Sequence, residues 1–179
     1  MIVNADLRSA EVIRRVRGID YPSVAEIGVY EGDMSRRLLY RLNLHLLMVD
    51  PWGTIESSDD DKYRAQSDED WEAVMNKALS GVSWAADRVR VFHGTSKDAA
   101  ETFDEKFDLV FLDGDHGYDA VYSDIEYWWP KIAEGGWLGG HDYRTDMDIG
   151  VIEAVNDWAD ENLIEIELGK NFTWWARKC

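Results

Sequence analysis

Cysteine, basic charge and long apolar runs are all scarce in this chain of 179 residues, and each shortage excludes a class of protein. The single cysteine, Cys179, allows no disulfide within the chain and no zinc site built from several cysteines, and it fits a reducing compartment. Nineteen basic residues stand against 36 acidic ones, and the net charge of −17 repels phosphate backbones, so we expect no nucleic-acid partner. No apolar run approaches the roughly 18 residues that a membrane span needs. Because Met1–Asp20 also lacks the apolar core of a signal peptide, we expect a cytoplasmic protein with no membrane partner.

The sequence does have enough apolar side chains for a core. Hydrophobic residues make up 45% of the chain and aromatic residues 12%, which excludes wholesale disorder. At roughly 100–200 residues per domain, the length predicts one domain over 1–179. Within it we expect an N-terminal helix inside 1–20 and an acidic insertion at 52–80 that could act as a lid, with Trp52, Tyr63 and Trp71 as stacking surfaces. Core packing of Trp71 is the alternative.

Short apolar runs alternate with amphipathic segments along the chain. The runs predict buried strands at 24–29, 44–49, 89–93, 107–112 and 137–140. The segments at helical spacing predict helices at 6–17, 33–42, 67–78, 96–103, 119–129 and 148–158. Repeated strand–helix units imply a parallel sheet with helices on both faces.

The C-terminal part of the chain has a different periodicity. Ile164, Ile166 and Leu168 alternate with acids, 169–171 is a turn signal and 172–176 returns, which predicts a hairpin. The predicted fold is therefore α/β: a Rossmann-like, doubly wound sheet of seven strands, mostly parallel, with one antiparallel strand from the C-terminal hairpin.

Several residues predict where these elements begin. Asp33 and Asp148 are expected to cap helices, and Ser67 with Asp70 forms a capping-box pattern. The pair Gly135-Gly136 is expected to end the unit before the fifth strand.

Ligands of doubly wound sheets bind beyond the carboxyl ends of the strands, so the residues at those positions are candidates. The first turn holds Gly28 and Gly32, whose spacing lets the backbone approach a ligand, and Glu26 could bind a cationic group. Asp50, about 20 residues past this turn, is placed to accept hydrogen bonds from a ribose diol. After the third strand, 94–98 consists of short polar residues and would lie near an adenine. A plain tight turn or a helix cap is the alternative at each position.

The densest set of chemical groups follows the fourth and fifth predicted strands. Asp113, Asp115 and His116 come after the fourth, and His141 and Asp142 after the fifth. Adjacent parallel strands bring their ends together, so three carboxylates and two histidines should share one cleft. Such a cluster costs electrostatic energy unless a cation or shared protons relieve it. Carboxylates suit magnesium, calcium or manganese, and imidazole favours transition metals, so we predict a functional site here. A structural hydrogen bond is the alternative for either histidine alone.

The order and spacing of these motifs resemble class I S-adenosylmethionine (SAM)-dependent methyltransferases. The resemblance runs from Val24 to the C-terminus and includes the closing hairpin. Within that superfamily the sequence is most similar to the macrocin O-methyltransferase-like group, whose metal-assisted members methylate hydroxyls, often on sugars.

This resemblance implies roles for the candidate residues. The cofactor would be bound at its amino acid end by Glu26, Gly28 and Gly32, at its ribose by Asp50, and beside its adenine by Thr95 and Ser96. Asp113, also beside the cofactor, would share a divalent ion such as Mg²⁺ with Asp142. His141 would be a third ligand, where a second carboxylate is usual in the family. Asp115 or His116 would be the general base.

The expected activity is O-methylation of a hydroxyl on a small molecule or sugar with SAM. The expected partner is that small hydroxylated acceptor, and the oligomeric state stays open. A nucleotide-binding oxidoreductase is one alternative, although the third glycine of the G-x-G-x-x-G fingerprint is missing. A non-catalytic SAM-binding module is another.

Overall fold

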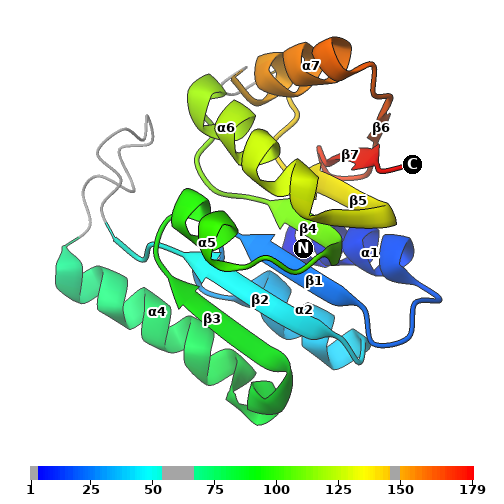
Figure 1. The fold of residues 1–179 in the computed structure, drawn as a ribbon. Coiled ribbons are helices and arrows are strands. Elements are labelled where there is room, and N and C mark those ends of the chain that lie inside the picture. Colours follow the sequence, from blue (N-terminus) through cyan, green and yellow to red (C-terminus); the bar gives the residue numbers. More distant parts are fainter. Residues whose placement is uncertain (1–3, 54–66, 146–149) are drawn as a thin grey trace.

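The computed structural model describes residues 4–53, 67–145 and 150–179, with side chains from Leu7 onward, and its seven strands form one sheet (Figure 1). The strands are β1 (Ser23–Ile27), β2 (His45–Asp50), β3 (Val89–His93), β4 (Phe107–Leu112), β5 (Ile132–Gly140), β6 (Ile166–Leu168) and β7 (Trp174–Arg177). Their order is β3-β2-β1-β4-β5-β7-β6, and β7 runs antiparallel to both of its neighbours. The predicted doubly wound sheet with one antiparallel strand is confirmed.

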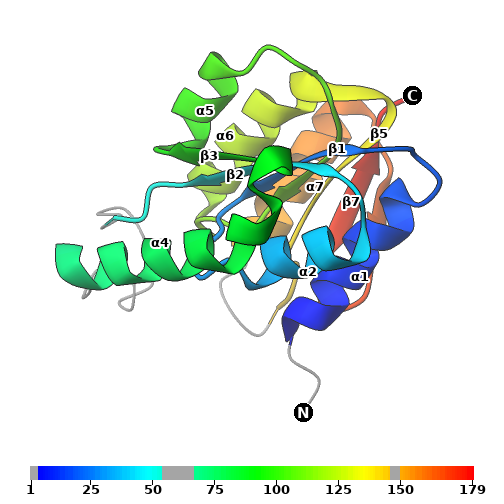
Figure 2. The same ribbon diagram turned by 90° about the horizontal axis from the view of Figure 1, so that it is seen from below.

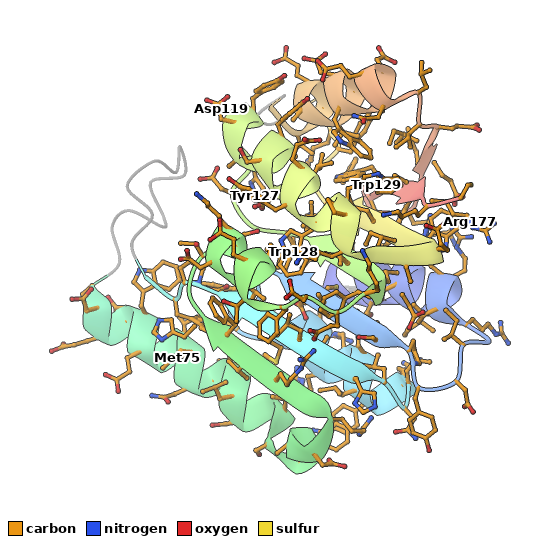
Figure 3. All side chains as sticks on the ribbon, viewed as in Figure 1. Met75, Asp119, Tyr127, Trp128, Trp129 and Arg177 are labelled. Atoms are coloured by element: carbon orange, nitrogen blue, oxygen red, sulfur yellow. The ribbon has the colours of Figure 1, made fainter. Side chains whose placement is uncertain are left out.

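Helices cover both faces of this sheet, as Figure 2 shows. One face carries α1 (Asn4–Val16), α2 (Asp33–Arg41) and α4 (Asp68–Val82), and the other carries α5 (Ser96–Thr102), α6 (Tyr118–Trp128) and α7 (Gly150–Asn162). Short 3-10 turns follow α4 (Ser83–Arg88) and α6 (Trp129–Lys131). Each face has its own apolar core: Leu38 packs in the first, and Trp128, labelled in Figure 3, is fully buried in the second. Because the central strands are buried on both faces, they are almost continuously apolar in sequence.

Two of the predicted element starts are wrong. The N-cap of α2 is Gly32, with a φ of 75° and no side-chain bond, and Asp33 is instead the first helical residue. Strand β5 begins at Ile132 and includes Gly135-Gly136, because the chain bulges between the pairs Ile132–Phe107 and Trp137–Leu109. An extra stretch of one strand can be absorbed in this way without ending the strand.

Other predicted caps have different outcomes. The capping box of Ser67 and Asp70 is confirmed at the start of α4. Asp148 lies outside the described residues, as does Tyr63. Of the proposed stacking residues, Trp52 and Trp71 are each only 4% exposed, so both pack inside the protein. Within the described ranges, no helix is long and apolar enough to cross a membrane.

The C-terminal hairpin packs tightly against the last two residues of β5. Gly139 pairs with Trp175 and Gly140 with Trp174 across the two strands. A Cβ atom on Gly139 would lie 2.2 Å from the Trp175 ring, and one on Gly140 would lie 2.6 Å from the Trp174 indole nitrogen. The hairpin therefore holds the end of β5, from which His141 and Asp142 follow directly.

Candidate active site

The turn between β1 and α2 is tight because of its neighbours in the protein. Gly28 has a φ of 86°, and a Cβ there would lie 2.2 Å from the backbone oxygen of Asp113. Gly32 lies against α4, where its Cβ would be 3.0 Å from the Cα of Ala78. The α-hydrogen of Gly28 that a Cβ would replace therefore faces the end of β4, and this contact by itself requires a glycine. Contact of either glycine with a cofactor stays a prediction.

Glu26 lies near the end of β1 and is 2% exposed. The Ser35 hydroxyl on α2 donates to its Oε2 at 2.5 Å. Burial raises the pKa of Glu26 to about 8, while the Ser35 bond and the positive charge of Arg8 oppose that rise. The carboxyl group is therefore largely protonated near neutral pH until a cation arrives beside it.

Asp50 ends β2 and organises the loops around it. Its Oδ2 accepts hydrogen bonds from the backbone N–H groups of Val29 and Tyr30, both at 2.8 Å, and its Oδ1 accepts one from Trp52 at 2.7 Å. Burial raises the pKa of Asp50 and these three bonds oppose the rise. An oxygen with two donors is saturated, so only Oδ1 has a lone pair left for a ribose hydroxyl.

The two residues expected beside the adenine have partners within the protein. The Thr95 hydroxyl caps α5 by accepting from the Asp98 N–H at 3.1 Å. The Ser96 hydroxyl accepts from the Trp128 indole at 2.9 Å and bonds to Asp124 on α6. The helix-cap alternative accounts for Thr95, and the role of either residue toward an adenine stays a prediction.

The ends of β4 and β5 bring Asp113, His141 and Asp142 together. One ligand atom from each lies within 4.8 Å of the other two. The Nδ1 of His141 is 3.0 Å from Asp142 Oδ2 and 3.5 Å from Asp113 Oδ1. Neither contact has the direction of a hydrogen bond, so this buried nitrogen has no such partner among the described residues. Three donor atoms this close together are near enough to bind one cation.

The charges of this cluster affect one another strongly. Burial lowers the pKa of His141, but the adjacent Asp113 and Asp142 outweigh it and raise the pKa to about 9. Burial likewise works to raise the pKa of Asp142, and the contacts with His141, together with the charges of His116 and Arg8, hold it below its usual value. Without a bound cation, His141 therefore serves as the positive charge between the two carboxylates.

The two candidate bases lie beside this cluster, in the loop before α6. His116 Nε2 is 3.1 Å from Asp142 Oδ2, and the His116 side chain is 31% exposed. The loop is packed against α7, because a Cβ on Gly150 would lie 2.7 Å from the His116 backbone oxygen. Asp115 instead accepts from the Gly117 N–H at 2.8 Å, at the N-terminus of α6. Both residues line a cavity of about 10 Å³ with Asp113 and His141.

Sequence reasoning missed Arg8. This residue of α1 donates a hydrogen bond from Nη1 to Oδ2 of Asp113, across 105 positions of the chain. The sequence contains a pattern that could have identified Arg8. The residue precedes the buried Val12 and Val16 at four-residue steps, so it lies on the face of the helix that packs against the protein. A charged residue on such a face indicates a buried partner.

Comparison with known proteins identifies the family of this chain. The family model described as a methyltransferase domain matches residues 25–143, the span that includes the β1–α2 turn, Asp50 and the whole Asp113–Asp142 cluster. The chain belongs to this methyltransferase family. No curated protein matches it closely enough to be counted.

Solved structures show the same fold for this methyltransferase. The O-methyltransferase NovP is 18% identical with a TM-score of 0.68, over 97% of this chain and 79% of NovP. CalS11, a calicheamicin methyltransferase, is 12% identical with a TM-score of 0.69, over 96% of this chain and 77% of CalS11. A SAM-dependent O-methyltransferase from Thermotoga maritima is 16% identical with a TM-score of 0.64, over 96% of this chain and 64% of that one. The macrocin-like subgroup has no support beyond this general likeness.

Proposed function

We propose that this methyltransferase transfers the methyl group of SAM to a hydroxyl oxygen of a small molecule or sugar, assisted by a divalent cation bound by Asp113, His141 and Asp142. One observation carries the proposal: three donor atoms from the ends of two neighbouring strands lie within 4.8 Å of one another, and one of them is a buried nitrogen with no hydrogen-bond partner among the described residues. Structural neighbours that are O-methyltransferases support the choice of oxygen as acceptor atom.

The chemistry of the donors fits a cation. Two carboxylates and one imidazole suit magnesium or manganese, and the imidazole also admits a transition metal. The His141 Nε2 lies 3.1 Å from the side-chain amide of Asn171, in the turn before β7. The atom of Asn171 facing the ring is its nitrogen Nδ2, so binding of a cation by Nδ1 requires the amide to turn over, with its oxygen accepting from Nε2–H and the Nδ1 lone pair left for the cation. A hydrogen bond between Asn171 and Nε2 would fix the orientation of the His141 ring, so that Nδ1 is positioned in advance to bind a cation.

The reaction needs an oxygen nucleophile and a place for its proton. The methyl group moves from sulfur to the acceptor oxygen, S-adenosylhomocysteine leaves, and the hydroxyl proton goes to a base. A divalent cation at the cluster would lower the pKa of a hydroxyl placed on it. His116 would accept the proton at Nδ1, with its Nε2–H turned toward Asp142. Asp115 is the weaker candidate because one of its oxygens already holds the Gly117 N–H.

The test compares cofactor binding with turnover. Calorimetry should show that S-adenosylhomocysteine binds, and turnover on a panel of hydroxylated acceptors should stop on chelation and return with magnesium or manganese. Asp142→Asn should behave like the chelated enzyme, whereas the control Asp119→Asn, at the start of α6 (Figure 3), should behave like the wild type.

Three other outcomes would contradict the proposal. Stabilisation by NAD without binding of S-adenosylhomocysteine would support the oxidoreductase, which the family match disfavours. Cofactor binding without turnover on any acceptor would support a non-catalytic module. Turnover that survives chelation would exclude a role for the cation, and the acidic cluster would then be a network of shared protons.

A further inference from the structure

Helix α1 lies outside the span that the family model matches, yet it reaches the centre of the candidate site. Its residue Arg8 donates from Nη1 to Asp113 Oδ2, and the two side chains are only 21% and 13% exposed. The helix is held elsewhere by different arginines: Arg14 and Arg15 pair with Glu11 on the same helix and with Glu167 on β6. Arg8 therefore has no part in attaching α1 to the hairpin.

The guanidinium of Arg8 has more donors than partners. It carries five N–H groups, and within the described ranges its hydrogen bonding is limited to Asp113. Its Nε is fully enclosed and has no acceptor among the described residues. Buried donors without acceptors are rare in native proteins, and each requires an explanation. The simplest is an anionic ligand that shares this guanidinium with Asp113.

Arg8 and Glu26 both lie near the carboxyl ends of β1 and β4: Arg8 bonds to Asp113, whose backbone N–H donates to Ile27, the residue after Glu26. The positive charge of Arg8 works to lower the pKa of both the Glu26 and the Asp142 carboxyls. A free α-amino acid group has an ammonium and a carboxylate on the same carbon. A carboxyl group and a guanidinium near the same edge of the sheet are the complementary arrangement, since guanidinium binds carboxylate in a planar, two-point fashion.

We propose that Arg8 binds the α-carboxylate of the cofactor, opposite Glu26 at its α-ammonium, so that α1 completes the cofactor site. This inference rests on the proposed use of SAM. It also places one guanidinium between the cofactor and Asp113, so that the cofactor's amino acid end is linked to the residue at the end of β4.

The test uses two ligands that differ only in the amino acid end. S-adenosylhomocysteine carries the carboxylate, whereas 5′-methylthioadenosine lacks both the carboxylate and the ammonium. Calorimetry in the presence of a chelator keeps the metal out of the comparison. Arg8→Gln should weaken S-adenosylhomocysteine roughly 10- to 100-fold, as expected for one lost charged hydrogen-bond pair, and leave 5′-methylthioadenosine unchanged. The affinity of Arg8→Lys for S-adenosylhomocysteine should lie between those of the wild type and Arg8→Gln. Lysine keeps the positive charge but loses the planar, two-point donor geometry of the guanidinium.

The matched control is Arg14→Gln on the same helix, whose side chain pairs away from the site and should affect neither ligand. Binding of 5′-methylthioadenosine also shows that the variant pocket is folded. Equal weakening of both ligands by Arg8→Gln, or no weakening of either, would overturn the assignment of the carboxylate to Arg8. Failure of the wild type to bind S-adenosylhomocysteine would overturn the proposed function itself, which is a different result.

Discussion

Gly28 and Asp113 are in backbone contact: a Cβ atom on Gly28 would lie 2.2 Å from the carbonyl oxygen of Asp113 and 2.6 Å from the nitrogen of Gly114. The contact joins the ends of β1 and β4, and therefore joins the turn expected at the cofactor to the first residue of the acidic cluster. A change at Gly28 should alter both regions together.

A pair of glycine substitutions separates this contact from backbone strain. Gly28→Ala should lower the free energy of unfolding by roughly 1–3 kcal/mol through overpacking, in addition to the roughly 1–2 kcal/mol that any side chain pays at positive φ. Gly18→Ala is the control, because Gly18 has a φ of 97° and nothing within 4 Å of its Cβ position. Denaturant unfolding measures the loss of unfolding free energy in each variant. Equal losses would show that β4 shifts to accommodate the added methyl group at no cost.

Asp50 should be important for stability as well as for binding. Asp50→Ala leaves three backbone N–H groups without their acceptor, so unfolding of the ligand-free protein should become easier by at least about 1–3 kcal/mol. Asp33→Ala, which loses only a surface ion pair with Arg36, should have little effect. A variant Asp50→Ala with unchanged stability and weaker S-adenosylhomocysteine binding would mean that Asp50 serves the ligand alone.

Glu26 should make stability fall as pH rises. Its pKa is about 8 in the folded protein and near 4.5 when exposed, so the folded state binds more protons between these values. The contribution of Glu26 is thus fully present below about pH 4.5 and is lost as pH rises through about 8. Glu26→Gln cannot titrate, and its advantage in unfolding free energy over the wild type should grow from pH 5 to pH 9. A difference that does not change with pH would contradict the raised pKa.

The same variant should lose affinity for S-adenosylhomocysteine if Glu26 binds the ammonium group. Stability and affinity would then move in opposite directions at pH 9, which calorimetry and thermal unfolding can follow on one sample.

The two candidate bases can be distinguished by rate. His116→Ala should lower turnover by roughly 10²–10⁴-fold, the usual effect of losing a general base, with little change in cofactor affinity. Asp115→Asn keeps an oxygen for the Gly117 N–H and should lower turnover much less. A larger loss of turnover in Asp115→Asn than in His116→Ala would assign the base to Asp115. Near-normal turnover in both variants would show that the general base does not lie in this loop.

Much of the architecture could be predicted because strand and helix periodicities are local. The apolar run at Phe107–Leu112 has the predicted boundaries, and the capping box of Ser67 and Asp70 is where its spacing indicated. The convergence of Asp113, His141 and Asp142 followed from topology alone, since neighbouring parallel strands end at the same edge. These predictions needed no knowledge of how side chains pack.

What the sequence could not show depends on contacts between distant segments. Asp33 is a good cap residue in isolation, but the tight turn at Gly32 is fixed by Ala78 on α4. In sequence, Gly135-Gly136 is typical of the end of an element. Only the pairing register of β5 against β4 shows that it forms a bulge within the strand. Arg8 reaches Asp113 because α1 packs beside α2, a relationship that no local pattern contains.

The two glycines at the end of β5 and the two tryptophans of β7 form an interlocked set of small and large residues. Neither member of a pair can change size alone, since a larger residue at Gly139 strikes the Trp175 ring and a smaller one at Trp175 leaves a void. Across divergent descendants of this chain, positions 139 and 175 should therefore vary as a pair, and so should 140 and 174. The acidic cluster and the hairpin would then be inherited as one unit, so recombination between homologues with a crossover in α7 should yield inactive hybrids more often than one within α4.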